Sequence, residues 1–302
     1  MHAAPTIFQD IYGRRQPGTR PWPAVVCAVL LAGSACDRIP QDMIVKNDAH
    51  IIVDDTTSFP RKIMLEYFTG HYCGNCPSAS KPAFDEIERL YGHRVVVMVI
   101  HAGAFAMPAL LPDNLDLRSE AGNRLYDEAG ITSVPAGVVN RVAYNGTLSI
   151  SPTAWSTVVG ERINSGSRFA IAIDTALMAD AATGSATVTV SVKNRAAGQQ
   201  EFCGWLVEDS IVGYQLDYYT TQYSDQKIPD YVFHDVLRLQ IIPAEGAGLS
   251  DSLLALSGNA VTRILGFTIN ESWVMRHCSL AFTIADAASG EILQCEKAVI
   301  VR

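Results

Sequence analysis

Two cysteines separated by two residues carry the strongest chemical signal in the sequence. Cys73 and Cys76 enclose Gly74-Asn75 and are followed by Pro77. A pair with this spacing can form a disulfide, exchange it with a partner protein, or supply half of a zinc site. No second CxxC or CxxH follows to complete a zinc site, and haem attachment needs a histidine where Pro77 stands. We therefore expect neither a metal nor a cofactor.

The cysteine pair lies between a predicted strand and a predicted helix. Residues 62–68 are apolar and β-prone without alternation, which is typical of a strand buried on both faces. After Cys76, apolar residues recur every three or four positions until Gly92, which predicts a helix with a glycine stop. Pro77 fits the first turn of this helix, whereas Pro82 should bend it.

This placement would make one of the thiols reactive. A thiolate at a helix N-terminus faces free N–H groups and the positive end of the helix dipole, which lowers a cysteine pKa from about 8.5 to about 3.5–7.5. Cys73 is therefore the predicted nucleophile, and Cys76 is the resolving thiol. His71, if protonated, would favour the thiolate, although a solvated loop histidine is the plainer interpretation. A structural disulfide without exchange activity is the alternative.

The segments after this helix alternate between strands and helices. The ranges 94–101 and 136–140 are predicted strands, 117–129 and 154–163 are predicted helices, and 104–115 is an irregular insertion. A strand, a CxxC helix, a strand, a helix and then Val134-Pro135 before a hairpin is the thioredoxin order. Residues 61–165 thus resemble a thioredoxin-like domain. The resemblance implies a cis Pro135 that packs against the disulfide and shapes a groove for an extended peptide.

Two positions differ from the thioredoxin pattern. The buried acid that accepts protons in thioredoxins aligns with Tyr67, and Glu66 is a neighbour that points to the opposite face of the strand. The dipeptide Gly74-Asn75 lacks the proline that keeps thioredoxin strongly reducing. The resemblance carries over the two cysteines and Pro135, with Val134 before it, and leaves the direction of electron flow open.

From residue 168 onward the hydrophobic period changes to two. The ranges 169–173, 188–192 and 280–284 alternate, with turn residues between them. Several short alternating strands predict a β-sandwich over residues 166–302. The predicted fold class is an α/β thioredoxin-like domain followed by an all-β immunoglobulin-like sandwich. The tyrosine-rich stretch 214–223 and His234-Asp235 are interpreted as an aromatic-lined loop and a strand edge.

Three cysteines lie on predicted strands of this second part. Cys203, Cys278 and Cys295 are expected to be buried reduced thiols. Cys278 and Cys295 would be offset across a hairpin and should not pair with each other. A bond between Cys203 and one of the other two is left open.

The first 35 residues resemble a targeting segment. Three arginines precede an apolar stretch at 24–32, small residues follow at 33–35, and then comes Cys36. This order predicts a secretory signal. The nine apolar residues are too few for a membrane-spanning helix, which needs ~20. Cys36 resembles the acylated cysteine of a bacterial lipobox, with an ordinary signal peptide and a chance cysteine as the alternative. Residues 36–60 would form a tether from the membrane.

The charge balance argues against one class of partner. The chain has 23 basic and 31 acidic residues and a net charge of -8. Because phosphate backbones repel an acidic protein, we expect no nucleic-acid partner.

The chain as a whole resembles the twenty-eight-kilodalton outer-membrane protein family of Gram-negative anaerobes. The lipobox, the tether, the string LEYFTGHYCGNCP at 65–77 and the β-rich second half carry this resemblance, as do 211–213 and 231–238. It implies an outer-membrane lipoprotein of the cell envelope, on the periplasmic or surface face. Asp37 after the lipidated cysteine leaves retention at the inner membrane open.

Two functions are compatible with these residues. The first is a membrane-anchored thiol-disulfide oxidoreductase that acts on thiols or disulfides of exported proteins. The second is a non-catalytic surface or periplasmic binding lipoprotein, in which the first domain is a scaffold and the sandwich contacts partners, with homodimer formation left open.

Overall fold

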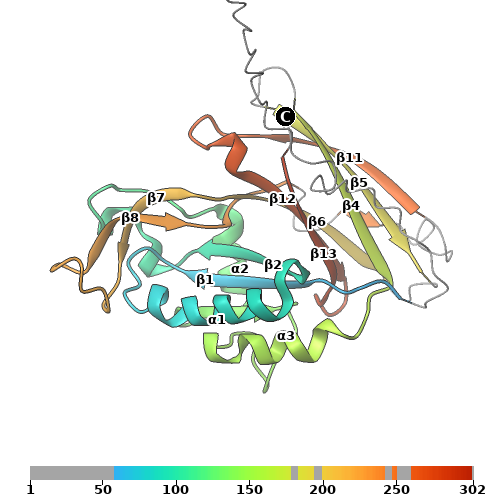
Figure 1. Ribbon diagram of the computed structural model, residues 1–302. Coiled ribbons are helices and arrows are strands. Elements are labelled where there is room, and N and C mark those ends of the chain that lie inside the picture. The colour runs from blue at the N-terminus through green and yellow to red at the C-terminus, as the bar shows by residue number, and fades with distance from the viewer. Residues whose placement is uncertain (1–57, 178–182, 194–198, 242–246, 250–259, 301–302) are drawn as a thin grey trace, which may run out of the picture. The chain divides into compact units, whose positions relative to one another are not determined.

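The computed structural model describes residues 58–177, 183–193, 199–241, 247–249 and 260–300 (Figure 1). Residues 51–302 group as one compact unit. The predicted signal segment, Cys36 and the tether up to residue 57 lie outside the described residues and stay predictions. Among the described helices, none combines the length and the apolar character needed to cross a bilayer.

An eight-stranded mixed sheet forms the centre of the fold. Its strands follow the order β13-β12-β6-β9-β2-β1-β3, and β10 pairs with β6 outside this path. β1 pairs in parallel with β2, β2 in parallel with β9, and the other neighbours are antiparallel. The strands span β1 Ile63–Thr69, β2 Val95–His101, β3 Ala136–Val139, β6 Gln200–Glu208, β9 Val236–Gln240, β10 Ala247–Leu249, β12 Cys278–Asp286 and β13 Ile292–Val299.

Two smaller antiparallel sheets accompany the large one. The first contains β4 (Phe169–Leu177), β5 (Thr183–Val192) and β11 (Ala260–Thr268) in the order β11-β5-β4. The second is a hairpin of β7 (Ile211–Leu216) and β8 (Lys227–Phe233). The hairpin therefore shares no ladder with the large sheet.

The helices follow the local predictions closely. α1 spans Cys76–Tyr91 with Gly92 at its C-cap, α2 spans Glu120–Glu128, and α3 spans Trp155–Ile163. Short 3-10 turns occur at Gly92–Arg94 and Pro152–Ala154, next to α1 and α3, and elsewhere at Ala104–Ala106, Pro108–Leu110 and Met275–His277. The predictions of a helix after the cysteines, of strands on both sides of it and of an irregular segment near 104–115 are confirmed.

Buried side chains form layers on both faces of the large sheet. One cluster, which includes Phe282, fills the space between the three-stranded sheet and one face of β6 and β12. A second covers the opposite face of these strands and continues onto β1 and β2, with Trp205 and Met98. A third packs α1 and α3 against the other face of β1, with Leu65 and Trp155. The strand that leads to the cysteines is thus buried on both faces, as predicted.

The predicted fold class, an α/β thioredoxin-like domain followed by an all-β immunoglobulin-like sandwich, is wrong. The described chain is mostly β-strand with few helices, in mixed and antiparallel sheets. Strands from both predicted parts belong to one sheet, which is joined where Val99 of β2 pairs with Val236 of β9. The boundary predicted between residues 165 and 166 falls between α3 and β4 and stays a prediction.

β12 explains why the pattern predicted a sandwich. Leu280, Phe282 and Ile284 alternate with Ala281 and Thr283, and a small or polar alternate residue is typical of a solvated face. In the structure all five are buried, because the second face of β12 packs against the core that it shares with β1 and β2. Small side chains on that face allow close packing against large neighbours such as Trp205.

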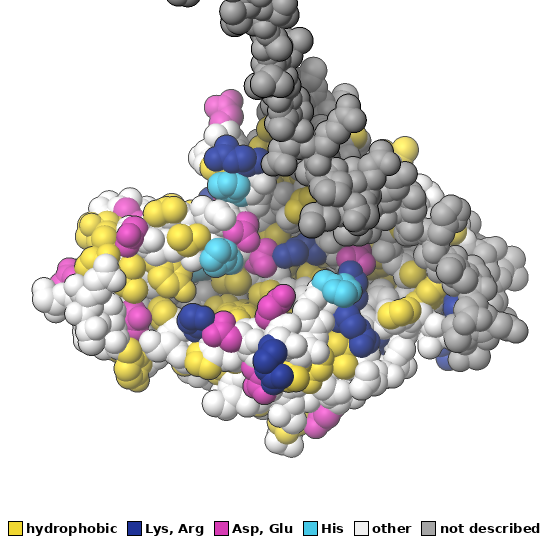
Figure 2. Space-filling view, viewed as in Figure 1, with side chains coloured by type: hydrophobic (Ala, Val, Ile, Leu, Met, Phe, Trp, Pro, Cys, Tyr) yellow, Lys and Arg dark blue, Asp and Glu magenta, His cyan; other side chains and the backbone are white. Residues whose placement is uncertain are grey.

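Hydrophobic side chains gather on the surface over the β7–β8 hairpin (Figure 2). Val212 is 61% exposed, and its cross-strand partner Val232 is 39% exposed. Tyr219, in the loop between the strands, is 67% exposed. Exposed apolar side chains that lie together on one hairpin are typical of a surface that contacts another molecule.

Candidate functional site

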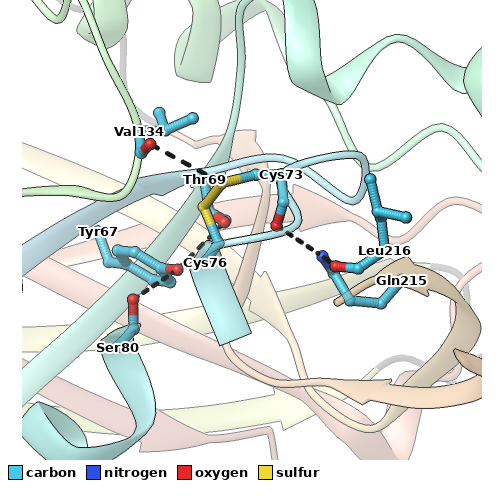
Figure 3. Close-up of a disulfide and its surroundings, with 8 residues drawn as sticks. All are labelled: Tyr67, Thr69, Cys73, Cys76, Ser80, Val134, Gln215 and Leu216. Carbon is cyan, nitrogen blue, oxygen red and sulfur yellow. Dashed lines mark hydrogen bonds between the residues drawn. A yellow bond between two sulfur atoms is a disulfide. The ribbon is translucent and has the colours of Figure 1, made fainter. Parts of the chain in front are cut away.

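Cys73 and Cys76 form a disulfide at the entrance to α1 (Figure 3). Cys76 is the first residue of the helix, and its N–H donates to the carbonyl of Cys73 at 3.0 Å. The N-cap residue, Asn75, makes no side-chain cap bond, and the first turn of α1 contains no acidic residue. The N–H of Cys76 is already used, and Pro77 has none, so the stabilisation of a negative charge here comes mainly from the dipole of α1.

The Val134-Pro135 peptide bond is cis and lies next to the disulfide. Sγ of Cys73 is 3.8 Å from the carbonyl oxygen of Val134 (Figure 3). A reduced Cys73 could donate its S–H to this carbonyl. The structure thus brings together Cys73, Cys76 and Val134, and Pro135 is the next residue, which leads into β3.

The end of the β7–β8 hairpin also contacts the disulfide segment, which the sequence analysis did not predict. The N–H of Leu216 donates to His71 O at 2.9 Å, and the N–H of Tyr218 donates to Gly74 O at 2.9 Å. Nε2 of Gln215 lies 3.3 Å from Cys73 O (Figure 3). These residues are some 140 positions away in sequence, and the signal for them was the tyrosine-rich stretch 214–223.

Both sulfur-bearing residues are enclosed. Cys73 is 4% exposed and Cys76 is 2% exposed. Val134 lies on one side of the disulfide, and Gln215 and Leu216 lie on the other (Figure 3). In this arrangement a protein partner has no direct path to either sulfur.

Tyr67, which the sequence resemblance aligned with a proton-accepting acid, lies near the disulfide among hydroxyl groups. Its hydroxyl accepts a hydrogen bond from Ser80 at 2.9 Å and donates one to Thr69 at 3.1 Å (Figure 3). Burial raises the pKa of Tyr67 to about 12, and the two hydroxyl partners oppose this shift. The phenol therefore stays neutral at physiological pH and cannot replace a carboxylate as a proton acceptor.

Glu66 lies away from the disulfide, on the face of β1 opposite to Tyr67. It is 2% exposed, and its carboxylate pairs with Arg141 at 2.6 Å. The Arg141 guanidinium in turn lies 5.8 Å from the ring centroid of Trp205. Glu66 is thus part of a buried ion pair inside the large sheet, and its placement argues against a supporting role at the sulfurs.

His71 is buried rather than solvated. One ring nitrogen, Nε2, lies 3.1 Å from the carbonyl of Met107, and the ring stacks on His101 at a centroid distance of 6.4 Å. Burial lowers the pKa of His71, which the Met107 hydrogen bond opposes. The imidazole is therefore neutral at pH 7, so its predicted role as a positive charge beside the Cys73 thiolate is not supported.

The remaining described cysteines are free thiols, as expected. Cys203, Cys278 and Cys295 are all buried and unpaired with one another. Burial raises the pKa of each, to about 12 for Cys278. Thiols that stay protonated at neutral pH and lie away from solvent are poor nucleophiles. His234 is exposed and pairs with Asp209 at 3.0 Å, consistent with the strand edge expected there.

The metal expectation can be compared with the described residues. Within them, no three histidine, cysteine, aspartate or glutamate side chains converge in a way that could hold a metal ion.

Solved structures with a related fold include HBP35 of Porphyromonas gingivalis. The two share 15% sequence identity with a TM-score of 0.62, over 80% of this chain and 76% of that one. This likeness supports a common fold. Weaker likenesses are to the protein AGR_C_4864 from Agrobacterium tumefaciens (11% identity, TM-score 0.47, 80% of this chain and 96% of that chain). A domain of the outer membrane lipoprotein Omp28 from P. gingivalis matches at 12% identity and a TM-score of 0.30, over 44% and 88%.

A comparison with curated protein sequences produced no match. The family described as outer membrane protein Omp28 matches residues 122–302, more than half of the chain. The match begins after the cysteine pair, so it carries no information about the disulfide. It confirms the family expected from the N-terminal string and the second half: the chain belongs to the Omp28 family of outer-membrane lipoproteins, and its location is the cell envelope.

Proposed function

We propose that this protein is a membrane-anchored thiol-disulfide oxidoreductase that acts on exported proteins. The observation that carries the proposal is the position of the Cys73–Cys76 disulfide at the uncapped N-terminus of α1, next to the carbonyl of Val134. A thiolate released here is stabilised by the positive end of the helix dipole, which no acidic residue in the first turn offsets. Cys73 is the attacking sulfur, Cys76 the resolving one, and Pro135 with Val134 forms the wall beside them.

The exchange conserves atoms and electrons with a protein dithiol as the only co-reactant. A partner thiolate attacks Sγ of Cys73, the Cys73–Cys76 bond breaks, and Cys76 leaves as a thiolate that takes up a proton. A second partner thiolate then attacks the partner sulfur of the mixed disulfide and releases Cys73. The partner is oxidised and the Cys73–Cys76 pair is reduced by two electrons. The reverse sequence reduces a partner disulfide.

The acidity of the Cys73 thiol tests this proposal. We expect the reduced protein to react with iodoacetamide at Cys73 well below pH 8, because the thiolate persists at a lower pH than that of a free cysteine, about 8.5. The measurement is the rate of alkylation against pH, followed by mass spectrometry of the peptide that contains residues 73–76.

The controls separate the thiol of interest from the others. Cys73→Ser should abolish the reaction at low pH, whereas Cys203→Ser should leave it unchanged because that thiol is buried. A Cys73 that reacts only as fast as a free cysteine, together with no reduction of insulin by the protein, would rule out exchange activity.

A second function is favoured by one observation, the burial of both sulfurs. With Cys73 and Cys76 at 4% and 2% exposure, the disulfide can also serve as a static brace in a binding lipoprotein. In that case the exposed apolar surface of the β7–β8 hairpin, around Val212 and Tyr219, is the place for partner contacts, including those of a homodimer. The same alkylation experiment distinguishes the two functions.

A further inference from the structure

The end of the β7–β8 hairpin covers the disulfide. It contacts the rest of the molecule mainly through hydrogen bonds to the segment that contains Cys73 and Cys76. We define the hairpin tip as residues 215–227, which include the end of β7 and the loop to β8. Within the described chain, the hydrogen bonds that join the tip to the molecule outside the β7–β8 hairpin end on residues 71–78. They join Leu216 to His71, Tyr218 to Gly74, Gln215 to Cys73 and Asp217 to Ser78.

The contact between Tyr218 and Gly74 is especially close. An ideal Cβ built on Gly74 would lie 2.6 Å from ring atoms of Tyr218, so only glycine allows the ring to approach this backbone. Gly74 is buried beneath the tip, whereas Tyr218 itself is 49% exposed. The ring of Tyr218 therefore lies across the cysteine motif with one side in solvent.

The base of the hairpin is fixed independently of the disulfide. Phe233 packs into a cluster with Leu117 and Val236, which Ile211 joins. The N–H of Tyr214 donates to Asp113 at 2.8 Å. The ladder between β7 and β8 shifts register between Gly213 and Gln215, and such a bulge interrupts the pairing between the anchored base and the tip.

The segment on the other side of the disulfide, Val134 and Pro135, is held more firmly than the hairpin tip. Val134 and Pro135 lead directly into β3, which pairs with β1 in the large sheet, and Ile131 before them is buried. A movement of this segment would disturb the core. A movement of the tip about the register shift would break the bonds to residues 71–78 and expose the buried side chains of Gln215 and Leu216, but it would leave the ladders of the large sheet intact.

We propose that the hairpin tip is a movable cover, which occupies the place of an extended substrate segment against residues 71–74. This inference rests on the proposed exchange function and names its substrate class. When the tip lifts, the carbonyls of His71 and Gly74 lose the N–H groups of Leu216 and Tyr218. The backbone N–H groups of an extended polypeptide fit these acceptors and would bring a partner cysteine to Cys73.

The rate at which the disulfide is reduced tests the cover directly. The oxidised full chain is treated with dithiothreitol, and new thiols on the peptide with residues 73–76 are trapped with iodoacetamide over time. Tyr218→Ala removes the ring that packs on Gly74, and Asp217→Ala removes the acceptor of the Ser78 hydrogen bond, so each variant should populate the open state more. Because the tip opens without unfolding of the protein, both should speed up reduction, by at least about tenfold for Tyr218→Ala. Tyr219→Ala is the matched control, since this neighbouring ring is exposed, and it should be reduced at the wild-type rate.

Hydrogen exchange of the wild-type protein provides a measurement that needs no variant. The amides of Leu216 and Tyr218 should exchange together, and faster than that of Val99, which donates to Asp235 at the base of the hairpin. Exchange of the tip amides at the Val99 rate, or equal reduction rates for Tyr218→Ala and wild type, would overturn the cover. If the cover lifts but Cys73 alkylates like a free cysteine, the exchange function fails and the cover stands.

Discussion

His101 shows how much one buried residue can contribute to the pH dependence of stability. The imidazole lies at the end of β2, 2% exposed, between His71 and the ring of Phe233. Neither of its nitrogens has a hydrogen-bond partner among the described residues. Burial lowers the pKa of His101 to about 3, and the nearby His71 and Arg238 add to this effect. The folded protein therefore keeps His101 neutral.

Acidification should destabilise the protein through this residue. Between pH 6.5 and pH 3 the unfolded chain binds a proton at His101 and the folded chain does not, so the free energy of unfolding falls as pH falls, by up to about 1.4 kcal/mol per pH unit. Urea unfolding at pH 7, 6 and 5 measures it. His101→Phe should remove this part of the slope and cost little at pH 7, because it removes unpaired polar atoms and keeps the ring. Equal slopes for the two proteins would contradict the assignment.

At the scale of elements, α2 illustrates a helix whose beginning depends on one side chain. Ser119 has an extended backbone, and its hydroxyl accepts a hydrogen bond from the N–H of Gly122 at 3.0 Å. Ser119→Ala should lower the free energy of unfolding by about 1 kcal/mol. Ser151→Ala is a fitting control, because Ser151 precedes a 3-10 turn without a side-chain cap bond, and it should stay within ~0.5 kcal/mol of wild type. Equal losses in the two variants would show that capping is not the cause.

Elements near the disulfide could be predicted because their signals are local. Gly92 ends α1, apolar positions repeat at helical spacing, and Val134-Pro135 precedes a strand. The place of the covering hairpin could not be predicted. The tyrosine-rich stretch 214–223 marks an aromatic loop, but the hydrogen bond between Tyr218 and Gly74 joins segments far apart in sequence, and neither segment identifies the other. The burial of His71 was missed for the same reason, because Met107 and His101 cover it from other segments.

At the scale of the whole molecule, Cys36 is the residue expected to hold the protein on the membrane. Acyl chains add about 0.8 kcal/mol of membrane binding for each buried methylene, so two or three chains hold a protein on a bilayer almost permanently. Cys36→Ser should move the protein from the membrane fraction to the soluble fraction of the envelope, without a change in the folded unit of residues 51–302. Retention of Cys36→Ser in the membrane fraction, or a wild-type mass without lipid, would contradict the anchor.

The fold class was mispredicted because it depends on contacts between strands far apart in the chain. Alternation in β12 has two explanations, one solvated face or two buried faces with small residues on one of them, and only the pairing of distant strands decides between them. β12 carries such small residues, Ala281 and Thr283, and its second face is buried in a cluster that includes side chains from β1 and β2. A local pattern contains no information about that neighbour.

The single pairing of Val99 with Val236 ties together parts of the chain that are synthesised at very different times. A chain that emerges N-terminus first holds β1, β2 and β3 long before β9 exists, and one edge of β2 is then bare. Unpaired apolar strand edges are templates for aggregation. Until the C-terminal strands are synthesised, the chain depends on chaperones or on fast folding to avoid aggregation. Truncated versions that end before residue 236 are therefore poor candidates for expression.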